Sequence, residues 1–522
     1  MLGDVTSRSP EEARAAFHAL QERLPDLWRS IEEKPGHRHV SVVVPSLSLN
    51  KDELAKIHGV PFYEERLLFI LMRLRHPRAR VLYVTSEPVP PEIVDYYLQL
   101  LVGVPASHAR ERLKMMCLYD SSPRPLTEKI LERPRVLSRM REFIGEPSRG
   151  YLTVFNSSEL ERDLAIQLGI PLNGVDPDLL DWGTKSGSRK IFRDAGLELP
   201  EGFEDVTNRD DVVRRLKDLR EKRPGLRRAV IKLNESFAGA GNAIFTYPEE
   251  LDDASIDEAL EKLDWGTEDE SSEVFFWKIE RIGGIVEELV EAEGVRSPSA
   301  QLRIAPTGEI LLVSTHEQLL GGSTGQRYMG CSFPADGAYR SVLQREAMKV
   351  GAVLRDKGVI SRFGVDFLTW KEGSSWRCSA IEINLRMGGT TFPFLALEFL
   401  TSGELSEEDG LFRTARGDEK YYVATDALTS DRYRGLLPED LIDLAIEDHL
   451  LFDPTTETGV LFHMIGALSE HGKLGLIAIG DSPEGARDLF DQTVRDLDRI
   501  GGDGSAKLDS GRELPSTVRR ID

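Results

Sequence analysis

The stretch SRFGVDFLTWKEGSSWRCSAIEINLR, residues 361–386, consists of two runs rich in β-branched and aromatic residues that flank Glu-Gly-Ser-Ser. Turn-forming residues between two such runs predict a β-hairpin. In the second run apolar residues alternate with polar ones, which places the polar side chains on one face of the strand. These polar residues are Glu382, Asn384 and Arg386.

The first strand of this hairpin contributes a further acidic residue. A turn centred between Lys371 and Trp376 places Asp366 opposite residue 381. A register error of about one residue brings Asp366 to the face that carries the polar side chains. Two carboxylates and an amide oxygen on neighbouring strands form an oxygen-rich site of the kind that Mg²⁺ prefers. A solvated sheet face is the alternative, and the placement of Asp366 favours the metal site.

A second feature is the glycine-rich stretch SFAGAGNAIFTYP, residues 236–248, which follows the apolar run AVIKLN. Gly239 and Gly241 form a G-x-G pair, but Ile244 occupies the place of the third glycine of a dinucleotide-binding motif, and a strand follows instead of a helix. We interpret the stretch as a hairpin tip whose backbone N–H groups form a nest for phosphate and close over a nucleotide as a lid. An ordinary exposed turn is the alternative.

Two lysines near this loop are candidates for phosphate contacts. Lys232 belongs to an apolar strand that reads as buried on both faces, and a buried ammonium group needs an anion. A solvated lysine on a half-exposed strand is the alternative. Lys185 directly precedes a helix predicted from Ser186, where the positive end of the helix and its free N–H groups attract phosphate.

A third candidate element is the end of an apolar stretch at residues 287–289. In an ATP site such a connector supplies backbone groups to the adenine and an acidic side chain to the ribose. An acidic surface loop is the alternative interpretation. The residues concerned are Glu287, Glu288 and Leu289.

The order of these features resembles the ATP-grasp superfamily, whose members hold ATP between two α+β lobes and join a carboxylate to an amine or similar nucleophile. The E-x-N-x-R pattern is similar to that of biotin carboxylase and carbamoyl phosphate synthetase. Over residues 39–498 the chain resembles the pheganomycin-type peptide ligase family. The segments that carry this resemblance include KSGSRKIFRDAGLELPEG, IKLNESFAGAGNA, SPSAQLRIAPTGEILLVSTHEQLLGGSTGQRYMGCSFP and EINLRMGGTTFPF.

The resemblance implies an α/β and α+β architecture in three parts. Strands that alternate with helical patterns before residue 175 predict a doubly wound parallel sheet, the pre-ATP-grasp domain. Residues 1–34 are predicted to form a helix, and the last module is a hairpin followed by a helix that Asp481 and Glu484 cap. The expected boundaries are 1–175 for the pre-ATP-grasp domain, 176–410 for the ATP-grasp core, 411–500 for the small C-terminal domain and 501–522 for a disordered tail.

The resemblance also implies the residues that would bind ATP. Lys185 and Lys232 would contact the phosphates, Gly239 and Gly241 would form the lid, and residues 287–289 would contact the adenine.

Metal binding and catalysis fall to another group of residues. Asp366, Glu382 and Asn384 would bind Mg²⁺, taken as two ions, with Mn²⁺ as an alternative metal. Arg386 would face the reacting carboxyl group. Arg303 and His316 would orient the carboxylate or accept the amine proton, with a structural role as the alternative. Gly364 stands where D-alanine ligases have an arginine, and Arg362 is a same-face position without an assigned role.

The implied reaction is attack of a carboxylate on ATP, giving an acyl phosphate that an amine then converts to an amide, with ADP and phosphate released. The partners would be a small-molecule or amino-acid carboxylate donor and an amino acid or peptide that supplies the amine, in natural product biosynthesis, with a homodimer as one possible assembly. An ATP-grasp carboxylate activator with a non-amino nucleophile, and a non-catalytic nucleotide-binding regulator, are the alternatives.

Composition narrows the partners further. The 522 residues carry a net charge of −22, which argues against nucleic acid or an anionic membrane as a partner. Three widely spaced cysteines show no disulfide or metal pattern. The N-terminal residues show no secretory signal and no apolar run is long enough to span a bilayer, so a cytoplasmic location is expected.

Overall fold

Five parallel strands form the N-terminal sheet, in the order β3-β2-β1-β4-β5. The computed structural model describes residues 9–34, 36–49, 54, 57, 59–235, 241–265, 271–321 and 327–501. The strands of this sheet are β1 (His39–Val44), β2 (Ala79–Thr85), β3 (Leu113–Cys117), β4 (Gly150–Val154) and β5 (Leu172–Asn173). The apolar residues of β1, β2 and β4 are buried on both faces, as in a sheet covered by helices on each side, whereas those of the edge strand β3 are half-buried.

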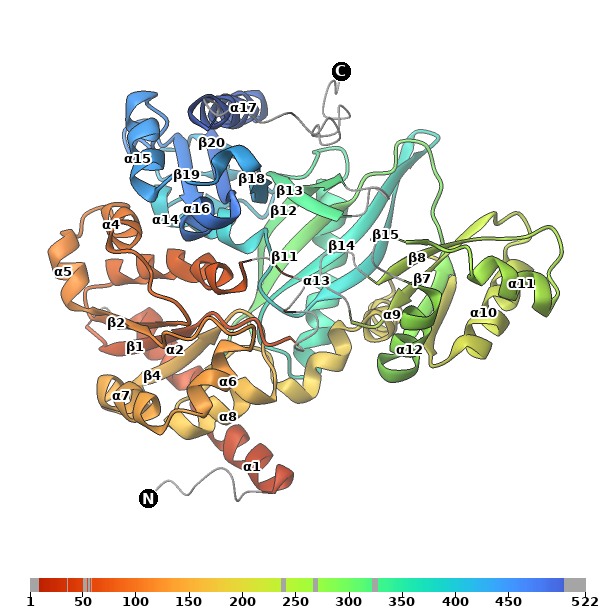
Figure 1. Cartoon of the computed structure of the whole chain (residues 1–522), viewed down its shortest axis with the longest axis horizontal. Coiled ribbons are helices and arrows are strands. Elements are labelled where there is room, and N and C mark those ends of the chain that lie inside the picture. The colour runs from red at the N-terminus through yellow and green to blue at the C-terminus, as the bar shows by residue number, and fades with distance from the viewer. Residues whose placement is uncertain are drawn as a thin grey trace.

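Helices cover both faces of this sheet, which confirms the doubly wound prediction (Figure 1). One face packs against α1 (Pro10–Gln21), α6 (Leu126–Leu131), α7 (Pro134–Ile144) and α8 (Glu159–Leu168). The other packs against the 3₁₀ helix η2 (Val60–Arg75), α4 (Pro91–Gln99) and α5 (Ala106–Glu111). The short η3 (Pro147–Arg149) precedes β4.

The predicted N-terminal helix is two helices rather than one. After α1 the chain turns and begins again as α2 (Leu24–Glu33). Pro25 lies in the first turn of α2, where its missing N–H group costs nothing, whereas it would break the interior of one continuous helix. Residues 1–8 lie outside the described residues.

A second sheet forms the lobe on the right of Figure 1, with antiparallel neighbours in the order β6-β10-β7-β8-β9. Its strands are β6 (Gly202–Val206), β7 (Arg228–Leu233), β8 (Asn242–Thr246), β9 (Asp264–Trp265) and β10 (Gly284–Glu288), and its helices are α10 (Arg209–Lys222), α11 (Asp253–Leu260) and α12 (Ser272–Ile282). Lys232 pairs with Asn242, so the glycine-rich stretch joins two antiparallel strands, as predicted.

A large antiparallel sheet forms the centre of the molecule, with the path β15-β14-β11-β12-β13-β18-β17-β16. Its first strands are β11 (Pro298–Ile304), β12 (Ile310–Gly321), β13 (Arg327–Phe333), β14 (Ser361–Glu372) and β15 (Ser375–Asn384). The apolar face of β11, β14 and β15 packs on α13 (Arg340–Asp356) and α9 (Lys185–Asp194), while η4 (Pro177–Gly183) leads into α9. The polar side chains of the β14–β15 hairpin therefore lie on the opposite face.

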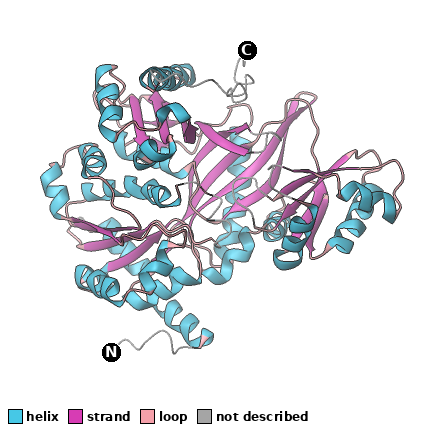
Figure 2. Ribbon diagram, viewed as in Figure 1, coloured by secondary structure: helices cyan, strands magenta, loops and turns pink. Residues whose placement is uncertain are grey.

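The C-terminal part extends the same sheet instead of forming a separate one. β18 (Glu419–Thr429) hydrogen-bonds to β13, and β20 (Lys473–Gly480) joins β18 to β19 (Gly459–His463). The remaining elements are α14 (Thr391–Thr401), β16 (Glu404–Leu405), β17 (Phe412–Arg413), η5 (Asp431–Tyr433), α15 (Pro438–Glu447), η6 (Ile465–Ala467), α16 (Leu468–His471) and α17 (Pro483–Ile500). Figure 2 shows these helices around the strands.

The cap of the last helix differs from the prediction. Ser482 caps α17 by accepting a hydrogen bond from the N–H group of Gly485 at 3.0 Å. Asp481 instead forms an ion pair with Lys420 at 2.5 Å, because it lies one residue too early to reach the helix amides. Residues 502–522, most of the predicted tail, lie outside the described residues. Within the described residues, no helix has the length and apolar character that a membrane span requires.

Candidate active site

The β14–β15 hairpin holds the three predicted metal ligands side by side. The turn lies where the sequence predicts it, but a β-bulge directly after Asp366 shifts the register by one residue. Asp366 therefore pairs directly with Glu382. On the same face Nδ2 of Asn384 donates a hydrogen bond to Oδ2 of Asp366 at 3.0 Å. The structure thus brings these side chains into one cluster.

A glutamine that sequence reasoning missed belongs to this cluster. Nε2 of Gln318, in β12, donates to Oδ1 of Asp366 at 2.8 Å. It reaches across β11, where the small side chain of Ser299 stands opposite Asp366. The alternation of Ser314, His316 and Gln318 marked a polar face of β12. Only the order of strands in the sheet shows which face of the hairpin it meets.

Lys185 is the first residue of α9, and this helix docks against the edge strand β15. Oγ of Ser188 accepts a hydrogen bond from the N–H group of Ile383 at 3.0 Å, which fixes the helix to this edge. Nζ of Lys185 consequently contacts Oε1 of Glu382, and the lysine side chain is only 6% exposed. The predicted phosphate lysine and a predicted metal ligand are therefore in direct contact.

The amide groups at the start of α9 already have partners. The N–H groups of Lys185 and Ser186 donate to the backbone and side-chain oxygens of Asn234 at 3.1 and 3.0 Å. The N–H group of Gly187 donates to Oγ1 of Thr184 at 3.0 Å. The free N–H groups expected at this helix end are thus occupied, and the Lys185 ammonium group is what this element offers to an anion.

Lys232 finds its anion within the chain. Its Nζ lies 2.6 Å from Oε1 of Glu287 in the neighbouring strand β10. The other oxygen of Glu287 accepts a hydrogen bond from Arg189 at 2.7 Å, and the glutamate side chain is 2% exposed. Arg189, one helical turn after Lys185, was not identified from the sequence. Because both oxygens of Glu287 are engaged, this carboxylate is not presented to a ribose hydroxyl here.

The other two residues of the predicted adenine connector pair within the same lobe. The N–H group of Glu288 donates to the carbonyl of Glu201 at 2.8 Å, and that of Leu289 donates to the carbonyl of Arg228 at 3.3 Å. The Glu288 carboxylate contacts Arg223 at 2.8 Å. The predicted contact between these residues and adenine stays a prediction.

The two central carboxylates differ in their electrostatic surroundings. Burial and the neighbouring Glu382 raise the pKa of Asp366, although Lys185, Arg386 and Gln318 act in the opposite direction. Burial also raises the pKa of Glu382, but the attraction of Lys185, Lys232 and Arg386 outweighs it and leaves this pKa below its ordinary value. Two half-buried carboxylates that repel each other fit a divalent cation, whose charge would relieve that repulsion.

The three candidate arginines occupy two places. Arg386 lies two residues after the end of β15, and burial lowers its pKa while Glu382 and Asp366 raise it. Arg303 in β11 pairs with Arg362 in β14, and its guanidinium lies 4.4 Å from the centre of the Trp28 ring. Arg303 therefore contacts the N-terminal part of the chain, whereas Arg386 belongs to the carboxylate cluster.

The glycine that departs from the D-alanine ligase pattern leaves room for a glutamine. A Cβ atom added to Gly364 would lie 2.9 Å from Nε2 of Gln301. The Gln301 amide thus covers the position two residues before Asp366. Arg362 lies on the same face of β14, two residues before Gly364 and therefore further from the carboxylates.

His316 is fully buried, beyond the carboxylate cluster in the central sheet. Its Nε2 lies 2.5 Å from the hydroxyl of Tyr422, and the ring contacts both that tyrosine and Phe333. Burial lowers the pKa of His316 to about 3. The complete burial of this histidine favours the structural alternative.

The lid prediction falls largely outside the described residues. Gly239 is not among them, whereas Gly241 is, with a φ angle of +90° that favours glycine. The carbonyl of Gly241 accepts a hydrogen bond from the N–H group of Leu233 at 2.9 Å, so it closes the hairpin ladder.

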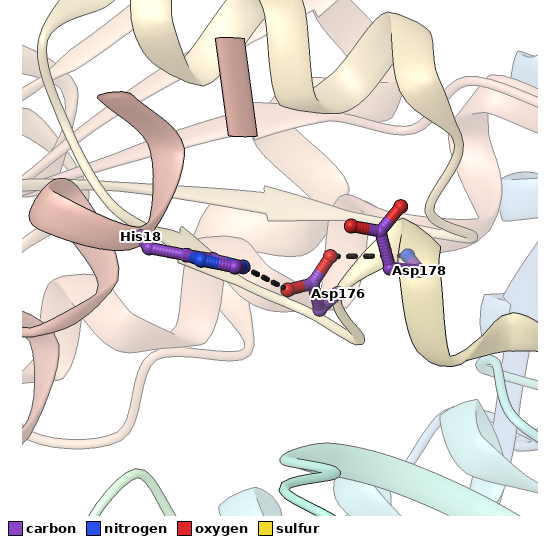
Figure 3. Close-up of side chains that lie close together, drawn as sticks. All are labelled: His18, Asp176 and Asp178. Carbon is purple, nitrogen blue, oxygen red and sulfur yellow. Dashed lines mark hydrogen bonds and ion pairs between the residues drawn. The ribbon is translucent and has the colours of Figure 1, made fainter. Parts of the chain in front are cut away.

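Figure 3 shows another cluster with metal-ligand spacing, formed by His18, Asp176 and Asp178. Nε2 of His18 lies 3.0 Å from Asp176. Arg162 contacts Asp176 at 3.1 Å and Asp178 at 2.7 Å, and Arg14 contacts Asp178 at 3.1 Å. Because these arginines neutralise the carboxylates, we interpret the cluster as a set of ion pairs that connects α1 to η4.

Two family models match the chain. The model for IQCH-like ATP-grasp domains matches residues 180–262 and 269–406, and the PGM1 C-terminal domain model matches residues 440–493. Biotin carboxylase from Campylobacter jejuni has the same fold, with a TM-score of 0.55, 11% identity, and coverage of 89% of this chain and 94% of that one. The biotin carboxylase domain of 2-oxoglutarate carboxylase from Hydrogenobacter thermophilus gives a TM-score of 0.54 at 12% identity, with 88% and 90% covered.

A curated relative matches nearly the whole chain. The L-propargylglycine–L-glutamate ligase of Streptantibioticus cattleyicolor is 30% identical over 440 residues, which cover 83% of this chain and 89% of the relative. IQ motif-containing protein H of Danio rerio is 22% identical over 421 residues, 71% of this chain and 39% of that protein. The chain therefore belongs to the ATP-grasp family, among the pheganomycin-type peptide ligases.

Proposed function

We propose that this chain is an ATP-dependent ligase that joins a carboxylic acid to the amino group of an amino acid or short peptide through an acyl phosphate. The observation that carries the proposal is the contact of Lys185 with Glu382 where Glu382 pairs with Asp366. The ammonium group that is predicted to bind phosphate thus contacts the oxygen-rich cluster that is predicted to bind a metal ion. The relative whose name joins L-propargylglycine to L-glutamate supports an amino acid as the amine.

Metal binding falls to the hairpin in this proposal. Asp366, Glu382 and Asn384 would hold Mg²⁺, which when bound neutralises charge on the phosphate oxygens. The donor set fits this ion, because it offers two carboxylates and an amide with little competition from softer ligands. Lys185 contacts Glu382, and the charge of Lys232 also acts on Glu382, so both ammonium groups would be available to phosphate oxygens near the metal.

The remaining predicted residues complete the nucleotide and acid sites. Gly239 and Gly241 would close over the phosphates, and residues 287–289 would line the adenine. Arg386 would face the reacting carboxyl group, since it follows the ligand strand and shares the field of both carboxylates. Closure of the loop would exclude water, which otherwise hydrolyses an acyl phosphate.

The reaction balances as two displacements. A carboxylate oxygen of the acid attacks the γ-phosphorus of ATP, and the bond to the β–γ bridging oxygen breaks, which releases ADP. The amine nitrogen then attacks the acyl carbon, the bond between that carbon and the phosphate oxygen breaks, and the amine loses a proton. The products are an amide, ADP and phosphate.

The test is a product assay with the full chain. The protein is incubated with Mg²⁺, ATP and pairs of amino acids and short peptides, and nucleotide, phosphate and amide are quantified. Formation of ADP, phosphate and amide in equal amounts, dependent on both organic substrates, is the expected result. AMP and pyrophosphate would refute the acyl-phosphate mechanism.

The same assay separates the alternatives. ADP formation with an acid but with a non-amino acceptor would indicate a different carboxylate activator. ATP binding without turnover on any pair would indicate a nucleotide-binding regulator. Replacement of Mg²⁺ by Mn²⁺ in parallel reactions tests which ion the hairpin accepts.

A further inference from the structure

A pocket beside the proposed metal site carries its own set of charged groups. It has a volume of about 290 Å³, including its open mouth, and Met387 and Gly388, just after Arg386, form part of its wall. The other walls come from distant parts of the chain: Arg66 in η2, Asp426 in β18 and His463 at the end of β19. The pocket therefore lies where the N-terminal part, the central hairpin and the C-terminal strands meet.

The pocket contains one ion pair in largely apolar surroundings. Nη2 of Arg66 lies 2.5 Å from Oδ2 of Asp426, and these side chains are only 13% and 12% exposed. The guanidinium also stacks on Tyr63 at 4.2 Å. Burying two charges costs several kcal/mol each, so a purely structural pair here would gain little. A guanidinium next to a carboxylate is complementary to a molecule that carries adjacent carboxylate and ammonium groups.

Two polar atoms in this pocket lack partners. Nε of Arg66 and Nδ1 of His463 are buried and make no hydrogen bond to any of the residues that the structure describes. His463 is 4% exposed and lines the pocket. Buried polar groups without a partner carry a free-energy cost, and a ligand that hydrogen-bonds to them would remove it.

Backbone irregularities place these side chains. A β-bulge between Thr425 and Leu428 leaves Asp426 outside the regular pairing of β18 with β20, and bulges commonly redirect side chains at functional sites. His463 pairs with Gly475, where an added Cβ would lie 2.2 Å from the imidazole ring. The ring therefore lies directly on the glycine.

The wall near the metal site is open. A Cβ atom added to Gly388 would meet no atom closer than 4.0 Å, so packing alone does not require glycine there.

We propose that this pocket binds the zwitterionic head group of a free α-amino acid substrate, with its carboxylate at Arg66 and its ammonium group at Asp426 and His463. This inference rests on the proposed ligase function, since it assigns one of the two substrates of that reaction to this pocket.

The test compares binding of L-α-amino acids and their analogues to the full chain with MgADP present. Thermal shift and calorimetry are run with the twenty common L-amino acids at about 10 mM, which detects dissociation constants near 1 mM. The best ligand is then compared with its desamino acid and its methyl ester. We expect each analogue to bind at least about 30-fold more weakly, because it leaves one partner of the ion pair without its counter-charge.

Variants give a second readout. Asp426→Asn and the charge-neutral double variant Arg66→Met with Asp426→Leu should each weaken amino acid binding about 30-fold or more, with MgADP binding changed less than about 3-fold. Asp409→Asn, which removes an exposed ion pair with Arg413, is the matched control and should change neither.

Several results would overturn the assignment. These are absence of any amino acid binding, equal binding of both analogues, or variants that fold and bind amino acids normally. Because the analogues are tested on the unaltered chain, the test does not depend on variants that fold. Amino acid binding without ATP-dependent ligation would leave the pocket assigned and refute the proposed function, and ligation of other acids without amino acid binding would do the reverse.

Discussion

The Glu382 carboxylate stands at the point where the two halves of the proposed site touch. Lys185 contacts it directly, and Asp366 faces it across the hairpin. The proposal gives the oxygen that Lys185 contacts to a metal ion as well.

Removal of this charge tests the metal assignment. Glu382→Gln should lower amide formation by about 100-fold or more, because it takes away a charged ligand and leaves Lys185 without its anion. Circular dichroism and the melting transition should show that the variant is folded. Glu372→Gln, in the same hairpin at an exposed position, is the control and should keep full activity. A fully active Glu382→Gln variant would refute the metal assignment.

A buried carboxylate in the N-terminal part should make the folding stability depend on pH. Burial raises the pKa of Glu65 to about 7, although the N–H group of Gly466 donates a hydrogen bond to it at 3.1 Å. In the unfolded chain this group titrates near its ordinary pKa. The folded state therefore binds more protons between those two values, and stability falls as pH rises from about 4.5 to 7.

Glu65→Gln should remove this pH dependence. The difference in free energy of unfolding between the variant and the original chain should shift in favour of the variant, by an amount on the order of 3 kcal/mol, between pH 5 and pH 8. Urea unfolding at both pH values measures the two differences. Equal differences at pH 5 and pH 8 would show that Glu65 ionises normally in the folded chain.

At the scale of elements, α9 connects the second lobe to the edge of the central sheet. Ser188 binds the backbone of β15, while Arg189 binds Glu287 of β10. The helix thereby sets Lys185 between the hairpin and the second lobe. Its position depends on a close approach to η4, where a Cβ atom added to Gly187 would lie 1.9 Å from the carbonyl oxygen of Asp181.

A substitution at this approach should displace the helix. Gly187→Ala should lower the free energy of unfolding by about 2 kcal/mol and reduce activity with it, because η4 and α9 must move apart. Gly225→Ala is the control, since nothing lies within 4 Å of its added Cβ, and should change stability by less than about 0.5 kcal/mol. Urea unfolding of both variants checks this. Equal stability of the two variants would contradict the close packing.

At the scale of the whole molecule, one apolar core joins all three parts of the chain. It includes Phe69 from η2, Phe392 from α14 and Ile477 from β20. Phe69 and Phe392 contact each other with ring centres 5.2 Å apart. The expected boundaries near residues 175 and 410 stay predictions, and this shared core predicts that the parts do not unfold independently.

Loss of a central ring tests this coupling. Phe392→Ala should destabilise the chain by about 3–5 kcal/mol and should raise hydrogen exchange in both the N-terminal sheet and the C-terminal strands. Exchange measured by mass spectrometry on peptides from β1 and β20 follows the two regions. Faster exchange in only one of them would show that the parts unfold separately.

Local sequence patterns predict much of the fold and of the proposed metal site. The alternation in residues 381–386 places Glu382 and Asn384 on one face, and the Glu-Gly-Ser-Ser turn defines the hairpin. The register differed by one residue because a bulge after Asp366 depends on backbone packing that no local pattern encodes. The proline at residue 25, which divides the N-terminal helix, was a local signal that the helical periodicity concealed.

Local patterns in the chain place each residue type on its strand or turn, because periodicity and turn chemistry act over a few residues. Which charges meet follows from the three-dimensional packing. Lys185 contacts Glu382, Lys232 and Arg189 share Glu287, and Tyr422 buries His316. These partners lie tens to hundreds of residues apart, and their meeting depends on strand order and helix docking, which the packing of the whole chain selects.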